Sequence, residues 1–217
     1  MQKKIEVLFE DDFFIAFYKP AGLLVIPTPQ KEKRTLTSIV KKQVGASLYP
    51  CHRLDRETSG VILFAKDKKS QQRLTEEFKK RKVRKIYIAF VRGKLKKKGG
   101  RINIPILDYH QRKHQKHCRP KPALTHYKVL ANKRKFSIVE VSPQTGRTNQ
   151  IRIHFSKLGH PLLGERVYAY RKDFDIHFRR VALHAQLIEF HHPFLKRKIR
   201  IQANLALDME KLLERYK

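Results

Sequence analysis

Two apolar runs begin the chain, Ile5–Phe9 and Phe13–Tyr18, and the acidic triplet Glu10–Asp12 separates them. An acidic break between two short apolar runs is typical of a hairpin turn, so we expect a pair of strands here. The segment Thr35–Val44 instead carries its apolar residues at helical spacing, and Gly45 follows as a stop signal. The pattern therefore predicts a hairpin followed by a short helix.

The central part of the chain alternates between strand and helix patterns. Val61–Ala65 is continuously apolar and short enough to be a buried strand. Asp67 suits an N-cap, and Leu74 with Phe78 lies on one face of the helix predicted to follow it. Lys85–Arg92 alternates between two faces, Ile86, Ile88 and Phe90 on one and Tyr87, Ala89 and Val91 on the other, so we expect a second strand.

The remaining pattern predicts more strands, two helices and two basic loops. The loops are residues 96–100 and 108–122, and one helix carries Ile151, Phe155 and Leu158 before Gly159. The last helix carries Leu205, Met209, Leu212 and Tyr216. The strands are expected around Thr125–Leu130, Phe136–Val141, Val181–Phe190 and Lys198–Gln202.

Many strands with a few interspersed short helices predict an α+β fold with a mostly antiparallel mixed sheet. No shift in composition and no Pro- or Ser-rich linker divides the chain, so we expect a single domain over residues 1–217. If the domain has two halves, they are expected to meet near residues 95–125 and to share one sheet.

The charge of the chain is far from average. Fifty Lys and Arg against nineteen Asp and Glu give a formal net charge of +31, spread along the whole sequence. Such an imbalance costs stability through self-repulsion unless a polyanion neutralises it, and nucleic acid is the obvious polyanion. An anionic membrane surface is the alternative, but we find no basic amphipathic helix with a broad apolar face.

Several features of location and redox state can be predicted. The first residues, MQKKIEVLFEDDFF, are acidic where a signal peptide needs an apolar run, and no stretch approaches the roughly 20 apolar residues of a spanning helix. Cys51 and Cys118, in unlike contexts, do not form a disulfide framework. We therefore expect a cytoplasmic protein with two reduced thiols.

The stretch Cys51–Gly60 packs titratable groups into a turn directly before a predicted buried strand. Such a turn can hold a side chain rigidly at a cleft. Asp55 stands between Arg53 and Arg56, and nearby cations favour the charged carboxylate. From the charge pattern alone, however, a surface ion-pair loop is the favoured interpretation.

The sequence around Asp55 resembles a known family. His52–Lys66 is similar to the signature of the RluA-like pseudouridine synthases, in which the Asp of this motif is catalytic. Five further segments resemble other motifs of that family, in the same order, and the resemblance spans residues 18 to about 193. They are Tyr18–Val25, Lys85–Ala89, Thr145–His154, Gly159–Glu165 and Leu183–Ala185. The resemblance implies the pseudouridine synthase catalytic fold and an isomerase that converts uridine in rRNA or tRNA.

The resemblance also implies roles for individual residues. Asp55 would either attack the sugar C1′ or remove a sugar proton, and Arg152 would orient it and keep it charged. Tyr87 would stack on a uracil flipped out of the RNA and help to remove its C5 proton. Arg53 would fill the gap left by the flipped base, and Leu183 would form an apolar wall of the pocket. The remaining substrate-binding candidates are His52, Leu54, Arg147 and Gln150.

Three positions depart from the family pattern. Asn149 stands where His is usual, Glu165 where Asp is usual, and Tyr18 where Asn is usual. The S4-type RNA-binding domain of many relatives is not expected ahead of the first strand. The catalytic body would then supply its own affinity for RNA, as a monomer, and the net charge of +31 fits that need.

One cluster of side chains invites a metal interpretation. His110, His114, His117 and Cys118 could supply the four ligands of a zinc site. Four cations accompany them, Arg112, Lys113, Lys116 and Arg119, and would repel a metal ion. We therefore expect a loop that contacts RNA, with no metal and no organic cofactor in the protein.

Two other functions are compatible with part of the sequence. A non-catalytic RNA-binding or ribosome-assembly factor would carry the same charge, but it has no need of the set Asp55, Tyr87 and Arg152. A metal-dependent nuclease needs clustered carboxylates, and the motif around Asp55 supplies no obvious second acid.

Overall fold

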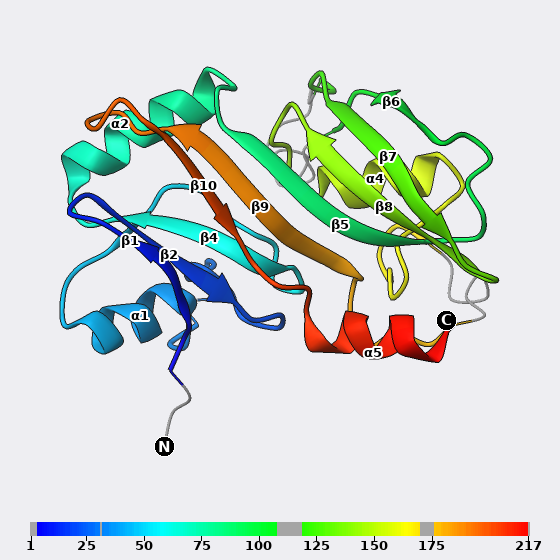
Figure 1. The fold of residues 1–217 in the computed structure, drawn as a ribbon, viewed down its shortest axis with the longest axis horizontal. Helices are drawn as coiled ribbons and strands as arrows, with labels where there is room; N and C mark the ends of the chain where they lie inside the picture. The colour runs from blue at the N-terminus through cyan, green and yellow to red at the C-terminus, as the bar shows by residue number, and fades with distance from the viewer. Residues whose placement is uncertain (1–3, 31, 108–118, 170–175, 217) are drawn as a thin grey trace. The chain divides into compact units, whose positions relative to one another are not determined.

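A computed structural model describes residues 4–30, 32–107, 119–169 and 176–216 (Figure 1). The chain divides into two compact units. The first unit comprises Met1–Lys85 and His184–Lys211, and the second comprises Ile86–Leu183 and Leu212–Lys217. The chain thus passes between the units at 85/86, 183/184 and 211/212. The meeting point expected near residues 95–125 is therefore wrong.

The strands of the first unit are antiparallel neighbours with one exception. The order is β1, β2, β4, β9 and β10, and the short β3 also pairs with β4. The exception is the parallel contact of β4 with β9, in which Ser59 lies opposite His184 and Gly60 opposite Ala185. The bounds are β1 Val7–Glu10, β2 Phe14–Lys19, β3 Tyr49–Pro50, β4 Ser59–Ala65, β9 Leu183–His191 and β10 Lys198–Gln202.

The strands of the second unit form an antiparallel set in the order β5, β8, β7 and β6. Their bounds are β5 Arg84–Arg92, β6 Gly99–Asn103, β7 Leu124–Asn132 and β8 Phe136–Pro143. The four helices in the described ranges are α1 Leu36–Val44, α2 Lys68–Lys79, α4 Gln150–Lys157 and α5 Leu207–Arg215. The predicted α+β class with a mostly antiparallel sheet is confirmed.

The helix boundaries follow the signals in the sequence. Thr35 caps α1 by accepting a hydrogen bond from the Ser38 N–H, and the Ser38 hydroxyl accepts in return from the Thr35 N–H. Gly45 ends the helix in the left-handed conformation, with φ of 74°. Asp67 caps α2 in the predicted way, by accepting from the Ser70 N–H at 2.8 Å.

The parallel contact of β4 with β9 depends on a glycine. Gly60 has φ of +113°, and a Cβ built there would lie 2.1 Å from the Ala185 carbonyl oxygen. No side chain fits that space, so Gly60 permits the two backbones to approach. This glycine closes the motif that carries Asp55, and it therefore anchors the end of that turn to the core of the unit.

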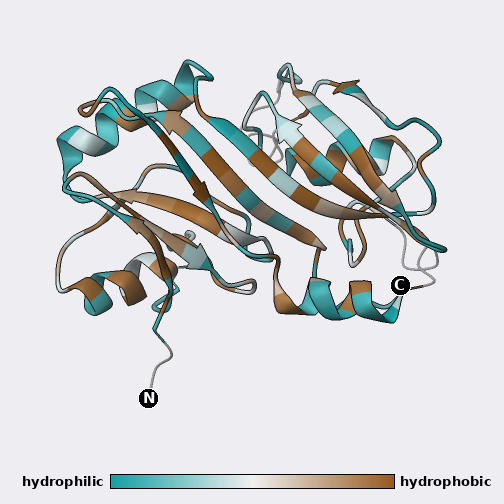
Figure 2. Ribbon diagram, viewed as in Figure 1, coloured by the Kyte–Doolittle hydropathy of each residue, from teal (hydrophilic) through white to brown (hydrophobic). Residues whose placement is uncertain are grey.

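Two hydrophobic clusters form the cores, one in each unit. All seven residues of β4 are buried, and Figure 2 shows this strand as hydrophobic along most of its length. Phe14 and Leu63 belong to the cluster of the first unit, and Phe155 and Leu162 to that of the second. The predicted basic loop at 96–100 is partly wrong, because β6 begins at Gly99 and pairs with β7. None of the helices in the described ranges is long and apolar enough to cross a bilayer.

A buried histidine joins the β1–β2 turn to the β9–β10 turn. His192 Nδ1 accepts backbone N–H groups from Phe194 and Leu195 at 3.2 and 2.9 Å, so the proton of the neutral ring belongs on Nε2. That Nε2 lies 3.2 Å from Asp11 Oδ2. Burial lowers the pKa of His192, although Asp11 acts in the opposite direction. The ring is surrounded by Phe13, Phe14, Phe190 and Phe194.

We predict that His192→Ala lowers the free energy of unfolding by about 2–4 kcal/mol, because it leaves a cavity among four phenylalanine rings. His191→Ala is the matched control, since its side chain is exposed at the end of β9, directly before His192, and its loss should change stability by less than about 0.5 kcal/mol. Urea unfolding of the three proteins at pH 7.5 measures both changes.

The same proteins give a pH test with a defined sign. The pKa of His192 is lower in the folded chain than its ordinary 6.5, so the unfolded state binds more protons and stability falls as pH drops below 6.5. Between pH 7.5 and 5, the free energy of unfolding of His192→Ala should therefore fall less steeply than that of the wild type. Some loss remains, because the pKa values of His52 and His154 are also lowered. An unchanged slope would contradict the assignment of a buried neutral His192.

Candidate functional site

Asp55 lies in the turn that leads into β4, in the first unit. The Thr58 N–H donates to the Asp55 carbonyl oxygen at 3.1 Å and closes the turn. Leu54 is buried, Arg53 is exposed, and Asp55 itself is half-buried. The turn therefore holds its apolar residue in the core and leaves Asp55 half-buried beside it.

The ammonium group of Lys19 stabilises this turn by hydrogen bonds to backbone carbonyl oxygens. The Lys19 side chain is fully buried at the end of β2, and its Nζ donates to three backbone carbonyl oxygens. The acceptors are Pro20 at 2.9 Å, Arg56 at 3.1 Å and Thr58 at 2.7 Å. Two of the three belong to the residues that follow Asp55, so one buried cation fixes the backbone on that side of the carboxylate.

A second set of bonds joins the same two segments. The Gly22 N–H donates to the Arg56 carbonyl oxygen at 2.8 Å, and Arg56 Nε donates to the Gly22 carbonyl oxygen at 3.3 Å. Gly22 has φ of +83°, which favours glycine. The segment Lys19–Gly22 thus forms a bracket that is hydrogen-bonded to the Asp55 turn.

His52 is part of the framework of the turn. Its ring stacks on Phe78 with centroids 5.0 Å apart, and its Nε2 accepts the Leu63 N–H at 3.1 Å. Burial, with the charge of Lys85 as a smaller cause, lowers the pKa of His52 to about 3. The imidazole is therefore neutral at physiological pH and ties the turn to α2 and β4. The predicted contact of His52 with substrate stays a prediction.

Cys51, directly before this turn, is a buried thiol rather than a reactive one. Burial raises the pKa of Cys51 to about 12, so the thiolate is not populated near neutral pH. Its Sγ lies 3.8 Å from the Tyr49 carbonyl oxygen. A covalent role for Cys51 does not fit this environment.

The second unit carries the other predicted site residues. Tyr87 is half-buried on β5 opposite Val141 and packs against the hydrophobic cluster of this unit. Leu183 is buried at the start of β9, and Arg180 Nη1 donates to its carbonyl oxygen at 3.2 Å. Both side chains are thus held on rigid elements rather than on loops.

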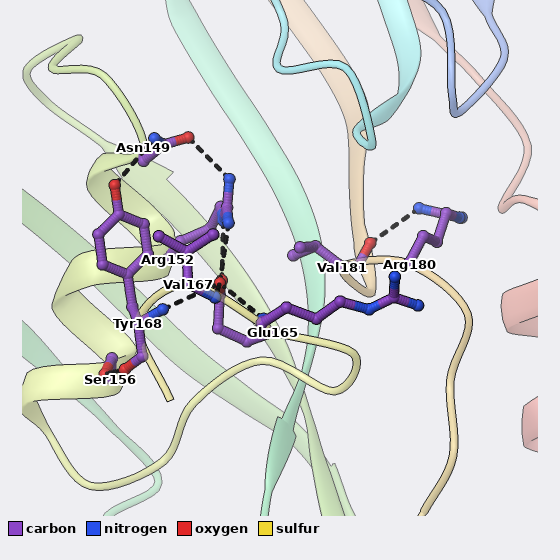
Figure 3. Close-up of polar contacts among 9 residues, drawn as sticks. Asn149, Arg152, Ser156, Glu165, Val167, Tyr168, Arg180 and Val181 are labelled. Atoms are coloured by element: carbon purple, nitrogen blue, oxygen red, sulfur yellow. Dashed lines mark hydrogen bonds and ion pairs between the residues drawn. The ribbon is translucent and has the colours of Figure 1, made fainter. Parts of the chain in front are cut away.

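Arg152 is held by polar contacts on three sides of its guanidinium group (Figure 3). It lies on α4, and its Nε and Nη2 donate to the two carboxylate oxygens of Glu165, each at 2.8 Å. Its Nη1 donates to Asn149 Oδ1 at 2.9 Å, and its guanidinium lies 5.2 Å from the centre of the Tyr168 ring. The Tyr168 hydroxyl in turn accepts from Asn149 Nδ2 at 3.0 Å. A bidentate pair with two lateral contacts fixes the plane of the guanidinium.

Glu165 is itself held by the backbone. Its Oε1 accepts N–H groups from Arg166, Val167 and Tyr168 at 3.0, 2.9 and 3.2 Å. Burial alone would raise the pKa of Glu165, but these bonds and the Arg152 guanidinium outweigh it and lower the pKa. Two of the three departures from the family pattern, Asn149 and Glu165, are therefore direct partners of Arg152.

Gln150 organises the turn that carries Arg147. Its Oε1 accepts from the Thr145 hydroxyl at 2.6 Å and from the Arg147 N–H at 3.0 Å. Its Nε2 donates to Leu124 O and Thr125 Oγ1 at 3.0 and 2.9 Å. The buried amide thus binds its own chain on both sides, and Arg147 is half-exposed beside it. The expected substrate contacts of Gln150 and Arg147 stay predictions.

The predicted site residues divide between the units. Arg53 and Leu54 accompany His52 and Asp55 in the first unit, and the residues of the second are Tyr87, Arg147, Gln150, Arg152 and Leu183. Within the first unit the structure joins His52, Leu54 and Asp55 in one turn, and within the second it joins Gln150 to Arg147. The action of Arg152 on Asp55 stays a prediction.

Sequence reasoning missed the two residues that hold the main candidates in place. Lys19 was part of a motif but had no role, although a lysine at the end of an apolar run before Pro20 was a usable signal. Glu165 was noted only as a departure, yet it is the carboxylate that orients Arg152. No pattern in the sequence indicates that pairing, because thirteen residues separate the two.

His110, His114, His117 and Cys118 lie outside the described residues. Within the described ranges, no three His, Cys, Asp or Glu side chains gather in an arrangement that could hold a metal ion.

Comparison with known proteins gives a consistent result. A family model described as RNA pseudouridylate synthase matches residues 13–157. The dual-specificity RNA pseudouridine synthase RluA of Pasteurella multocida is 40% identical, over 87% of this chain and 88% of that protein. The tRNA pseudouridine synthase C of Haemophilus ducreyi is 34% identical, over 98% and 96%. The uncharacterized RNA pseudouridine synthase YhcT of Bacillus subtilis is 35% identical, over 98% and 72%.

Solved structures agree with the sequence relatives. Human RNA Pseudouridylate Synthase Domain Containing 4 aligns with a TM-score of 0.79 at 26% identity, over 96% of this chain and 92% of that one. Human RNA Pseudouridylate Synthase Domain Containing 1 shares the fold, with a TM-score of 0.78 at 23% identity over 98% and 94%. The sequence relatives, the fold and the motif around Asp55 together show that this chain belongs to the RluA-like family of RNA pseudouridine synthases.

Proposed function

We propose that this protein isomerises specific uridines to pseudouridine in rRNA, tRNA or both, with Asp55 as the catalytic residue. The observation that carries this proposal is the Asp55 turn, which Lys19 and Gly22 bracket and which Gly60 anchors. A surface ion-pair loop, the competing interpretation of the same sequence, has no need of a buried ammonium group beneath it. The protein would act as a monomer in the cytoplasm, without metal or organic cofactor.

The reaction sets clear demands on the residues. The bond between uracil N1 and the sugar C1′ breaks, the base turns, and a C5–C1′ bond forms while C5 loses a proton and N1 gains one. The net change is an isomerisation with no redox step. Asp55 either attacks C1′ or removes a sugar proton, and an ionised carboxylate serves both routes.

Tyr87 and Arg152 have roles that suit their settings. Tyr87 is fixed on a strand, so its ring can stack on a flipped uracil and its hydroxyl can assist the transfer of the C5 proton. Arg152 is fixed in one plane by Glu165 and Asn149, and such a preorganised cation can orient a carboxylate and keep it charged. Arg53, exposed beside Asp55, would fill the space that the flipped base leaves in the RNA.

The names of the relatives support both of the proposed classes of RNA substrate. One is named a dual-specificity RNA enzyme and another a tRNA enzyme, so both RNA classes stay open for this chain. The structure of the Asp55 turn does not discriminate between rRNA and tRNA as substrates. Mapping pseudouridines in total RNA from cells with and without the gene identifies the substrate, and a complete set of unchanged sites would count against an enzymatic role.

We predict that Asp55→Asn lowers turnover by roughly 10²–10⁴-fold or more while RNA affinity changes little. The substitution is nearly isosteric but removes the charge that the chemistry needs, whereas affinity depends mainly on phosphate contacts. Tritium release from RNA that contains 5-tritiated uridine measures turnover, and filter retention measures binding.

Asp12→Asn is the matched control, because Asp12 is an exposed carboxylate in the β1–β2 turn of the same unit. It should keep wild-type turnover. Full activity of Asp55→Asn would remove Asp55 from the mechanism. An inactive wild-type protein that still binds RNA would favour the non-catalytic RNA-binding alternative.

We further predict that Tyr87→Phe and Tyr87→Ala differ. Phe keeps the stacking surface, worth about 1–3 kcal/mol per base, so substrate binding should hold while turnover falls. Ala should lose both binding and turnover. Single-turnover kinetics separate the two effects, and Tyr127→Phe serves as a control because Tyr127 packs against Phe155 in the same unit. If Tyr87→Phe kept the wild-type rate, the hydroxyl would have no part in proton transfer.

A further inference from the structure

The second unit contains a basic hollow that none of the catalytic candidates occupies. It has a volume of about 690 Å³ and is lined by residues of the β7–β8 turn and of the C-terminal end of α5. Its lining residues are Asn132, Lys133, Arg134, Lys135, Arg215 and Tyr216.

The lining has one sign of charge. Four of the six residues are cations and none is a carboxylate, so the hollow concentrates positive potential. The loop between β5 and β6 carries four more exposed lysines of the same unit, Lys94, Lys96, Lys97 and Lys98. Like charges so close together repel one another, and an anion that binds among them relieves that repulsion.

The base of the hollow is rigid. The Lys133 N–H donates to the Phe136 carbonyl oxygen at 2.8 Å and closes the β7–β8 turn. Asn132 Nδ2 donates to the Leu95 carbonyl oxygen at 3.2 Å, and the Gly93 N–H donates to the Lys135 carbonyl oxygen at 2.9 Å. These bonds tie the β7–β8 turn to the β5–β6 loop. The cations therefore extend from a fixed backbone, which lowers the entropy lost when they bind a ligand.

Ser137 completes this network from inside the turn. Its Oγ accepts the Leu95 N–H at 3.0 Å and lies 2.8 Å from the Gly93 carbonyl oxygen and 2.6 Å from Asn132 Oδ1. The Ser137 side chain is fully buried. One buried hydroxyl thus joins three backbone or amide groups of the two basic segments and keeps their spacing constant.

An aromatic ring forms one wall of the hollow. Tyr216 is half-buried and packs edge-on against the buried Phe136, with ring centroids 5.6 Å apart and an interplanar angle of 86°. This edge-on contact fixes the orientation of the Tyr216 ring beside the four cations that line the hollow. Cations that track a backbone, next to an aromatic ring on which a base can stack, are what sequence-tolerant binders of single-stranded nucleic acid combine.

We propose that this hollow is a second RNA-binding site, which takes a single-stranded segment of the substrate outside the catalytic residues. Its cations bind successive phosphates, and Tyr216 stacks on one unpaired base. The inference rests on the proposed function only in that it takes RNA as the ligand. The site supplies affinity from the catalytic body itself, without sequence readout, because phosphate and stacking contacts are tolerant of sequence.

A membrane surface fits the same charge but not the same shape. A peripheral membrane site needs exposed apolar residues that enter the lipid interface. The hollow has a partly buried tyrosine and no aliphatic residue in its lining. A concave cationic site with one aromatic wall is better matched to a polynucleotide chain.

The test is binding of a fluorescent, unstructured 20-nucleotide RNA to full-length protein over a range of salt concentrations. The variant replaces Lys133, Arg134, Lys135 and Arg215 together with Gln. Its log–log salt slope should flatten by about 2–3, because each phosphate contact on a single strand contributes about 0.7. Affinity at 0.1 M salt should fall on the order of tenfold or more, with unchanged turnover at saturating RNA.

A control with the same loss of charge separates a local site from general attraction. It replaces Lys41, Lys42, Lys68 and Lys69, which are exposed on α1 and α2 of the first unit, with Gln. Its affinity should change less than about threefold. Equal losses in the two variants would overturn the proposal, since binding would then follow net charge alone.

Tyr216 gives an independent arm of the same experiment. Tyr216→Ala should weaken binding of the single-stranded RNA on the order of tenfold but barely affect a duplex of equal length, and Tyr216→Phe should bind as the wild type does. Equal effects of Tyr216→Ala on both RNAs would exclude base stacking. Loss of binding to anionic lipid vesicles in the four-residue variant, with RNA binding intact, would replace RNA by a membrane as the ligand.

Discussion

A buried lysine is the constraint on which the catalytic turn depends. Moving an ammonium group out of water costs several kcal/mol unless its donors are paired. At Lys19 three backbone carbonyl oxygens meet that need, and two of them lie just after Asp55. The dependence is mutual, because each of the three carbonyl oxygens would lose a hydrogen-bond donor without the Lys19 ammonium group. The position of the Asp55 backbone is thus coupled to the stability of the first unit.

In the second unit the charges are reversed, because a buried carboxylate positions a cation. Arg152 is the group to be positioned, and Glu165 is the buried ion that holds it, supported by three backbone N–H groups. In each unit, then, a charged side chain with a structural role fixes the element that carries the proposed catalytic residue. Preorganisation of this kind lets a site stabilise charge without reorganising at the moment of reaction.

The sequence predicted much of the local structure, because most signals were local. The cap Asp67, the stop at Gly45 and the strand at Lys198–Gln202 all appear as expected. The division into units was missed because β9 returns to β4 from more than a hundred residues away, and no local pattern encodes such a pairing. For the same reason the roles of Lys19 and Glu165 emerged only from the fold. The motif around Asp55 came from resemblance, since charge alone allowed an ordinary ion-pair loop.

The most direct test of this account is the rate of hydrogen exchange at two backbone amides. The Gly22 N–H binds Arg56 O and the Thr58 N–H binds Asp55 O, so both report on the bracketed turn. In Lys19→Met these amides should exchange at least about tenfold faster than in the wild type, while the amides of α2, such as Gln71, remain protected. Unchanged exchange at Gly22 and Thr58 would contradict the claim that the Lys19 ammonium group holds the Asp55 turn in place.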